Sequence, residues 1–173
     1  MTILVRNTLD RIYRWAGYLA AIFLILILCL VTLQMVARWI GLNVAGASDI
    51  TGYSMAAASF LAFPYALNNG SHIRVSLLLN AAGRYKWFVE LWCWVLACIF
   101  TGLFAWFAVK LTIESHKWDE ISGGQDAWPL WIPQTAMAVG TVLFAISAID
   151  NLITHIRTGE DNIKPTALDM HSE

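Results

Sequence analysis

The sequence predicts an all-α integral membrane protein with four transmembrane helices. Of its 173 residues, 58% are hydrophobic and only 13% are charged, whereas a soluble domain has about 25% charged residues. The apolar residues gather in four long runs that contain almost no charge, and each run is long enough to cross a bilayer. The nine tryptophans suit the membrane–water interface, where aromatic rings are enriched.

The first helix is expected over about 12–40. Its uncharged run, 15–37, reaches about 34 Å at about 1.5 Å per residue, and the hydrocarbon core is about 30 Å thick. The run is longer than the apolar part of a signal peptide, and no small-residue cleavage site follows it, so we expect it to be retained. Arg38 and Trp39 close it, because an arginine can extend to the headgroups and a tryptophan anchors there.

The second helix is expected over about 49–68, with Ser48 as its N-cap and Asp49 in its first turn, near the positive end of the helix dipole. Small residues recur at intervals of four. A partner helix rewards such close backbone approach and lipid does not, so we expect this helix to face a partner. The small residues that form these rows are Gly52 with Ala56, and Ala58 with Ala62 and Ala66.

A basic connection follows, in which His72 and Arg74 lie and no acidic residue occurs. Within it, 74–82 is expected to lie at the membrane surface, with its apolar residues dipping in. The third helix is expected over about 86–115 and is followed by an acidic connection.

The fourth helix is expected over about 131–156, with Trp131 at its start and Pro133 in its first turn, where proline is tolerated. Residues 1–157 would thus form one four-helix domain, and 158–173 a polar tail.

The distribution of basic residues predicts the orientation. Eight Lys and Arg residues lie before the first helix, between the second and third, and after the fourth, against three on the opposite side. Basic residues favour the cytoplasmic side. We therefore expect both termini and the connection that carries His72 in the cytoplasm, with the acidic connection outside.

The residues give little support to an enzyme, and no catalytic, cofactor-binding or metal-binding residue is predicted. No HExxH, CxxC, phosphate-loop or nucleophile-elbow pattern occurs. No histidine lies in the apolar runs, where a haem would need ligands. No cofactor and no nucleic-acid partner are expected. Two alternatives stay open: an autonomous four-helix carrier or exporter with Glu90 as its coupling residue, and a redox membrane anchor.

Several short motifs, in order, resemble one known family. Arg38 closes the first span, Asp49 opens the second, and Gly70-Ser71-His72-Ile73-Arg74-Val75 follows it. Pro129-Leu130-Trp131-Ile132-Pro133 leads into the last span. Over about 10–157 the chain resembles the small membrane subunit, DctQ-like, of tripartite ATP-independent periplasmic (TRAP) transporters. Ser48 and Ser76 depart from the family pattern, which often has acidic residues there.

The resemblance implies a scaffold role in a bacterial or archaeal cytoplasmic membrane. In this family the small subunit pairs with a large membrane subunit, which holds the sodium and substrate sites and works as an elevator. A periplasmic binding protein delivers the solute, usually an organic acid. The small subunit would widen the fixed scaffold, in contact with membrane lipids, and would have no transport site of its own. His72 and Arg74 would tie their connection to the helices or to the large subunit.

Overall fold

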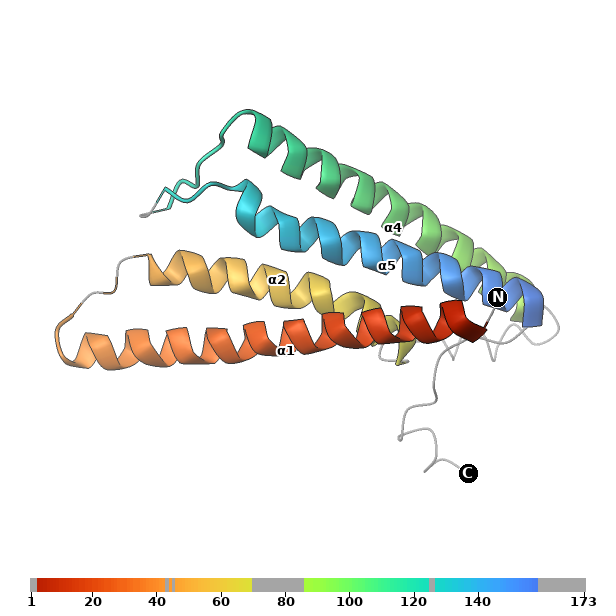
Figure 1. Ribbon diagram of the computed structural model, residues 1–173, viewed down its shortest axis with the longest axis horizontal. Helices are drawn as coiled ribbons and strands as arrows, with labels where there is room; N and C mark the ends of the chain where they lie inside the picture. Colours follow the sequence, from red (N-terminus) through yellow and green to blue (C-terminus); the bar gives the residue numbers. More distant parts are fainter. Residues whose placement is uncertain (1–2, 43, 45, 70–85, 125–126, 159–173) are drawn as a thin grey trace, which may run out of the picture.

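The computed structural model describes residues 3–42, 44, 46–69, 86–124 and 127–158, and its regular structure is helical (Figure 1). The helices are α1 (Ile3–Trp39), α2 (Ala47–Asn68), α4 (Lys86–Lys117) and α5 (Trp131–Thr158). All four are long and apolar enough to cross a membrane. The expected all-α fold with four membrane-spanning helices is therefore confirmed.

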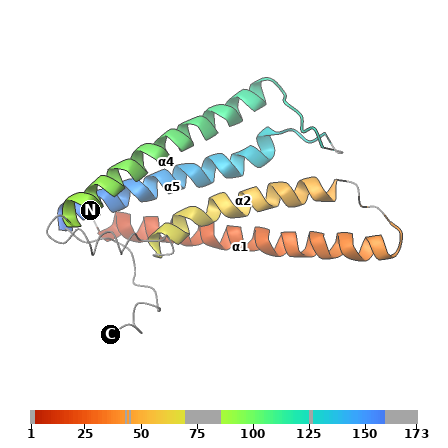
Figure 2. The ribbon, with the colours of Figure 1, turned by 180° about the vertical axis from the view of Figure 1, so that it is seen from behind.

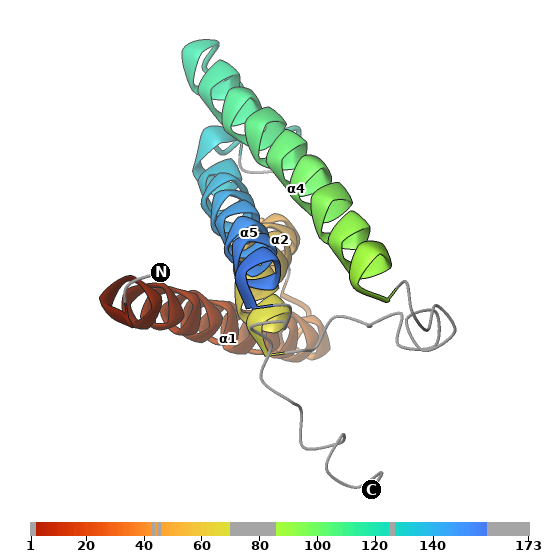
Figure 3. The ribbon, with the colours of Figure 1, turned by 90° about the vertical axis from the view of Figure 1, so that its right-hand side faces the viewer.

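The helices lie side by side in the order α1, α2, α5, α4, and the row stays open. Figure 1 shows α1 and α4 at opposite edges, and Figure 2 shows the same order from behind. In the end-on view of Figure 3, α2 and α5 occupy the middle while α1 and α4 diverge from them. The main packing contacts run between α1 and α2, between α2 and α5, and between α4 and α5. Because the row does not close, every helix keeps part of its apolar surface uncovered.

Two helix beginnings differ from the expectation. Helix α1 begins at Ile3 rather than near residue 12, because residues 3–14 contain neither Gly nor Pro and Tyr13 is buried, with 2% of its surface exposed. Ser48 as N-cap of α2 was wrong: Gly46 occupies that position with φ 72°, and no side chain caps the helix. Asp49 does lie in the first turn of α2. The expected interfacial segment 74–82 lies outside the described residues.

Small side chains fill the interior of the row and let the helices approach closely. Gly17 of α1 lies against the ring of Tyr65 on α2, where a Cβ atom would be 2.9 Å from Cγ. On the other side of the row, the hydroxyl of Thr112 on α4 donates to the carbonyl oxygen of Gln134 on α5, at 3.3 Å. The buried alanines are Ala16, Ala20 and Ala37 on α1, Ala47, Ala57 and Ala58 on α2, Ala105 and Ala108 on α4, and Ala145 and Ala148 on α5.

The acidic connection between α4 and α5 folds back on itself and reaches α2. Glu120 accepts two hydrogen bonds that hold this turn together. Its carboxylate accepts one from the Ser115 hydroxyl at 2.7 Å. Its carbonyl oxygen accepts one from the backbone N–H of Leu130 at 2.9 Å. Ser122 and Tyr53 of α2 are joined through their hydroxyls. The connection is thereby attached to the first turns of α2.

Candidate partner interface

The joint between α2 and α5 holds the two halves of the row together, and a proline and a glycine shape it. Pro64 lies inside α2 and is buried. A proline has no backbone N–H and cannot bond the carbonyl four residues earlier, which here belongs to Phe60. Gly140 of α5 lies against that carbonyl: a Cβ atom at Gly140 would be 2.6 Å from the carbonyl carbon and oxygen of Phe60. Glycine at 140 thus permits the backbones of α2 and α5 to meet.

A polar tie closes the same joint at its other end. The side-chain oxygen of Asn68 on α2 accepts hydrogen bonds from the Ser147 hydroxyl at 3.4 Å and from Asn151 Nδ2 at 3.3 Å. Asn151 Nδ2 also donates to the carbonyl oxygen of Ser147 at 2.8 Å. Ser147 and Asn151 are fully buried. In an apolar surrounding such groups are costly to leave unpaired, so this tie fixes the register of the two helices.

The ends of α4 and α5 are joined by aromatic contacts. His155, fully buried near the end of α5, stacks on Trp87 at the start of α4 with ring centroids 6.1 Å apart. At the other end, Trp131, one of the predicted family-motif residues, meets His116 edge to face at 5.0 Å. Pro133 is the third residue of α5, half-buried. Trp131 and Pro133 therefore lie where α5 begins and α4 ends.

The predicted residues Arg38 and Asp49 lie at the end of the row opposite the N-terminus. Arg38 is in the last turn of α1 and is exposed. It borders a hollow of about 430 Å³ between the end of α1 and the start of α2, with Gln34 and Ser48. Asp49 is half-buried, and its carboxylate lies directly against the backbone of Gly124 in the acidic connection. Arg38 thus faces the hollow between α1 and α2, whereas Asp49 faces the acidic connection.

The two rows of small residues on α2 lie on different sides of the helix, one exposed and one partly buried. Gly52 and Ala56 are exposed, and no neighbouring atom among the described residues lies within 4 Å of a Cβ atom built at Gly52. Ala58 has 5% of its surface exposed and packs within the chain itself, while Ala62 is half-buried. The row of Gly52 and Ala56 is therefore open to lipid or to another protein, and Ala58 is occupied by the chain's own packing. His72 and Arg74 lie outside the described residues.

Sequence reasoning missed an exposed row on α5 that runs the whole length of the helix. The row consists of β-branched residues spaced alternately by three and four positions, a spacing that places them on one side of a helix. That spacing and the residue type were readable in the sequence. We call this row the α5 ridge; its members are Ile132, Thr135, Val139, Val142, Ile146, Ile149, Ile153 and Ile156.

Within the described residues, no three His, Cys, Asp or Glu side chains come close enough to hold a metal ion. The hydroxyls of Thr101, Thr112 and Thr141 each donate to a carbonyl four residues earlier, at 2.7 to 2.9 Å. These hydroxyls are thereby satisfied within the bundle, and that of Thr112 also bonds across α4 and α5.

Comparison with known families gives one match. Residues 27–158 match the profile of the family described as tripartite ATP-independent periplasmic transporters, DctQ component. The matched stretch begins within α1 and covers α2, α4 and α5. No curated protein sequence and no solved structure matches the chain significantly.

Proposed function

Because the chain belongs to the DctQ component family of tripartite ATP-independent periplasmic transporters, we propose that it is the fixed scaffold beside the large membrane subunit. Family membership and four membrane-spanning helices make the chain a multi-pass membrane component of such a transporter. The further proposal is that it carries no transport site. It packs on a large subunit that moves the solute, and it offers its outer end to a periplasmic binding protein.

We also propose the finer features of this role, which follow from the family resemblance and from the distribution of charge. They are sodium-driven import of a small solute, most often an organic acid in this family, and a location in the bacterial inner membrane with both termini in the cytoplasm. The excess of basic residues on the side of the termini supports the orientation. The pairing of threonine hydroxyls with their own helix carbonyls supports a packing role rather than a solute path.

The observation that carries the scaffold proposal is the α5 ridge. Helix α5 is in the middle of the row and packs on both α2 and α4, yet this side of it remains uncovered. Alternating spacings of three and four suit left-handed packing against another membrane helix. β-branched side chains are stiff, so their docking costs little rotamer entropy. We propose that a helix of the large subunit packs along the α5 ridge.

A co-purification experiment tests this surface. Val142→Trp and Ile149→Trp place bulk in the middle of the α5 ridge, and Leu103→Trp places the same bulk on the exposed side of α4. Overpacking costs about 1–3 kcal/mol, so we expect each ridge variant to bind the large subunit roughly 5- to 150-fold more weakly. Leu103→Trp should bind normally. If the ridge variants bind as well as Leu103→Trp, the α5 ridge faces lipid instead.

Reconstitution tests the scaffold role itself. The large subunit, the binding protein and this chain are placed in liposomes, and solute uptake is measured under a sodium gradient. We expect uptake that needs all three components. Normal uptake without this chain would overturn the proposed role, whatever the ridge variants show. Flux through liposomes that contain this chain alone would instead favour an autonomous carrier.

A further inference from the structure

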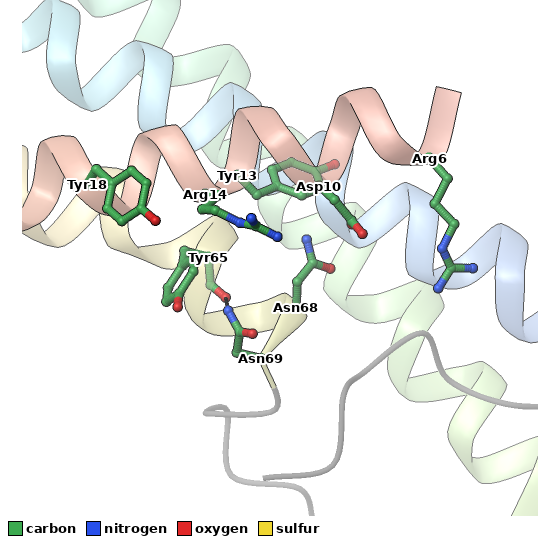
Figure 4. A pocket seen from close by; sticks show the side chains of 8 residues that line it. All are labelled: Arg6, Asp10, Tyr13, Arg14, Tyr18, Tyr65, Asn68 and Asn69. Atoms are coloured by element: carbon green, nitrogen blue, oxygen red, sulfur yellow. Dashed lines mark hydrogen bonds between the residues drawn. The ribbon is translucent and has the colours of Figure 1, made fainter. Parts of the chain in front are cut away.

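A polar pocket lies at the end of the row where the chain begins, in the part of α1 that precedes the family match. Its volume is about 300 Å³, and it opens between the first turns of α1 and the last turn of α2 (Figure 4). The matched family region starts only at residue 27. The residues that carry the argument are Arg6, Asp10, Tyr13 and Arg14 from α1, and Tyr65 and Asn68 from α2.

The charges of the pocket favour an anion with a single negative charge. Arg6, Asp10 and Arg14 are spaced four residues apart and therefore lie on one side of α1. Within the described residues, neither arginine forms an ion pair with Asp10. Among the side chains that border the pocket, two guanidinium groups and one carboxylate leave a net positive charge. Asp150 of α5 is buried and acts on Tyr13 electrostatically, but it does not border the pocket. Guanidinium groups bind phosphate oxygens through paired N–H donors, and the carboxylate can accept a hydrogen bond from a ligand hydroxyl.

A further donor at the inner wall lacks an acceptor. Asn151 Nδ2 donates to the Ser147 carbonyl, which fixes the orientation of the Asn151 amide. It also donates to the side-chain oxygen of Asn68, which fixes the Asn68 amide in turn. Asn68 Nδ2 is then left buried without a hydrogen-bond partner in the described part of the chain. Figure 4 shows it directed toward the side where Asp10, Tyr13 and Arg14 lie.

The pocket lies at the level of the lipid headgroups. Arg14 is the last charged residue before the uncharged run of α1. Trp15 and Tyr18 follow at once, pack edge to face at 5.9 Å, and are largely exposed. Tyr65 of α2 is also exposed and borders the pocket. Exposed tryptophan and tyrosine mark the interface between hydrocarbon and water, so the arginines are at the depth of the phosphates.

We propose that this pocket binds a phosphate oxyanion, supplied by the phosphodiester of an anionic phospholipid headgroup in the leaflet on the side of the termini. Arg6 and Arg14 bind the phosphate oxygens. The headgroup must displace the side chains that cover Asn68 Nδ2 for this buried donor to find its acceptor there. Asp10 accepts a hydrogen bond from a headgroup hydroxyl. A lipid bound in this way holds the first turns of α1 against the end of α2. This inference goes beyond the scaffold role and does not depend on it.

Native mass spectrometry of the full chain in detergent tests the proposal, with dioleoylphosphatidylglycerol as the probe. We expect one saturable lipid, bound more tightly than dioleoylphosphatidylcholine, which lacks the net negative charge and the hydroxyls. Arg6→Gln and Arg14→Gln should each weaken this first binding step roughly fivefold, the effect of one basic residue near an anionic surface. Arg11→Gln is the matched control, because Arg11 is on the same helix and does not border the pocket.

Three results would overturn the assignment. An equal loss of lipid affinity in Arg11→Gln would show that the effect comes from the general surface charge and not from this pocket. Equal affinities for the two lipids would show that the net charge of the headgroup does not determine binding. Displacement of the lipid by millimolar inorganic phosphate, together with binding of phosphate alone, would assign the pocket to a soluble phosphate. All three arginines are exposed, so the variants should fold, and circular dichroism checks that they do.

Discussion

Replacement of Gly140 by alanine should loosen the joint between α2 and α5. A Cβ atom at this position would lie 2.6 Å from the carbonyl carbon and oxygen of Phe60 and 2.8 Å from its Cβ atom. A relaxed contact between carbon and a carbonyl oxygen begins at about 3.3 Å. The two backbones would therefore have to separate by about 0.7 Å, since neither is the end of a flexible side chain.

The expected magnitude follows from two opposing effects. Overpacking of this kind costs about 1–3 kcal/mol. Alanine in place of glycine inside a helix gains up to about 1 kcal/mol in propensity. Gly102→Ala on α4 has the same gain in helix propensity without the clash, because in the part of the chain that the structure describes no neighbouring atom lies within 4 Å of a Cβ atom there. The difference between the two variants isolates the clash, and we expect Gly140→Ala to be less stable by about 1–3 kcal/mol.

The assay is thermal unfolding of the purified chain in detergent, followed by the near-ultraviolet circular dichroism of its tryptophans. For a chain of this size, 1 kcal/mol corresponds to a shift in Tm of about 2–4 °C. We expect a Tm for Gly140→Ala several degrees below that of Gly102→Ala. A Tm for Gly140→Ala at or above that of Gly102→Ala would refute the close contact with the Phe60 carbonyl.

Two further predictions concern α2 and its tie to α5. Asn151→Leu leaves the Asn68 side-chain oxygen with only the long bond from Ser147, so the chain should lose about 1–3 kcal/mol. The comparison variant is Thr154→Val, since the Thr154 hydroxyl donates to the Asp150 carbonyl of its own helix; a Tm for Asn151→Leu no lower than that of Thr154→Val would contradict the prediction. Ala58→Leu should destabilise the isolated chain, because Ala58 is buried within it, whereas Gly52→Leu should not. Equal melting temperatures for these two α2 variants would show that Ala58 is not confined by the chain.

The sequence made the four helices readable, because hydropathy and length alone decide whether a segment spans a bilayer. The beginning of α1 was less readable. Counting uncharged residues stops at Arg14, whereas the helix continues to Ile3 through a charged segment that buries Tyr13. The N-cap of α2 was misplaced because a glycine with positive φ, Gly46, begins the helix without a side-chain cap.

The candidate interface was only partly predictable. The spacing of small residues predicted a partner-facing α2, but spacing does not say which neighbour covers which side. Gly52 and Ala58 belong to the same pattern, and only the order of helices in space separates the exposed residue from the buried one. The α5 ridge has a regular spacing, yet isoleucine and valine suit lipid as well as protein, so its exposure had to come from the structure.

The order of the helices also defines how the chain divides. Helices α1 and α2 form one hairpin and α4 and α5 form a second. The α2–α5 contact is the main one that joins them, beside the contact of the acidic connection with α2. In a membrane, each span can be inserted before the spans associate. A defect at the joint, such as one at Gly140, would therefore leave both hairpins inserted with correct topology and parted from each other. Such a chain would pass every topology assay, and only a probe of distance between α2 and α5 would reveal the fault.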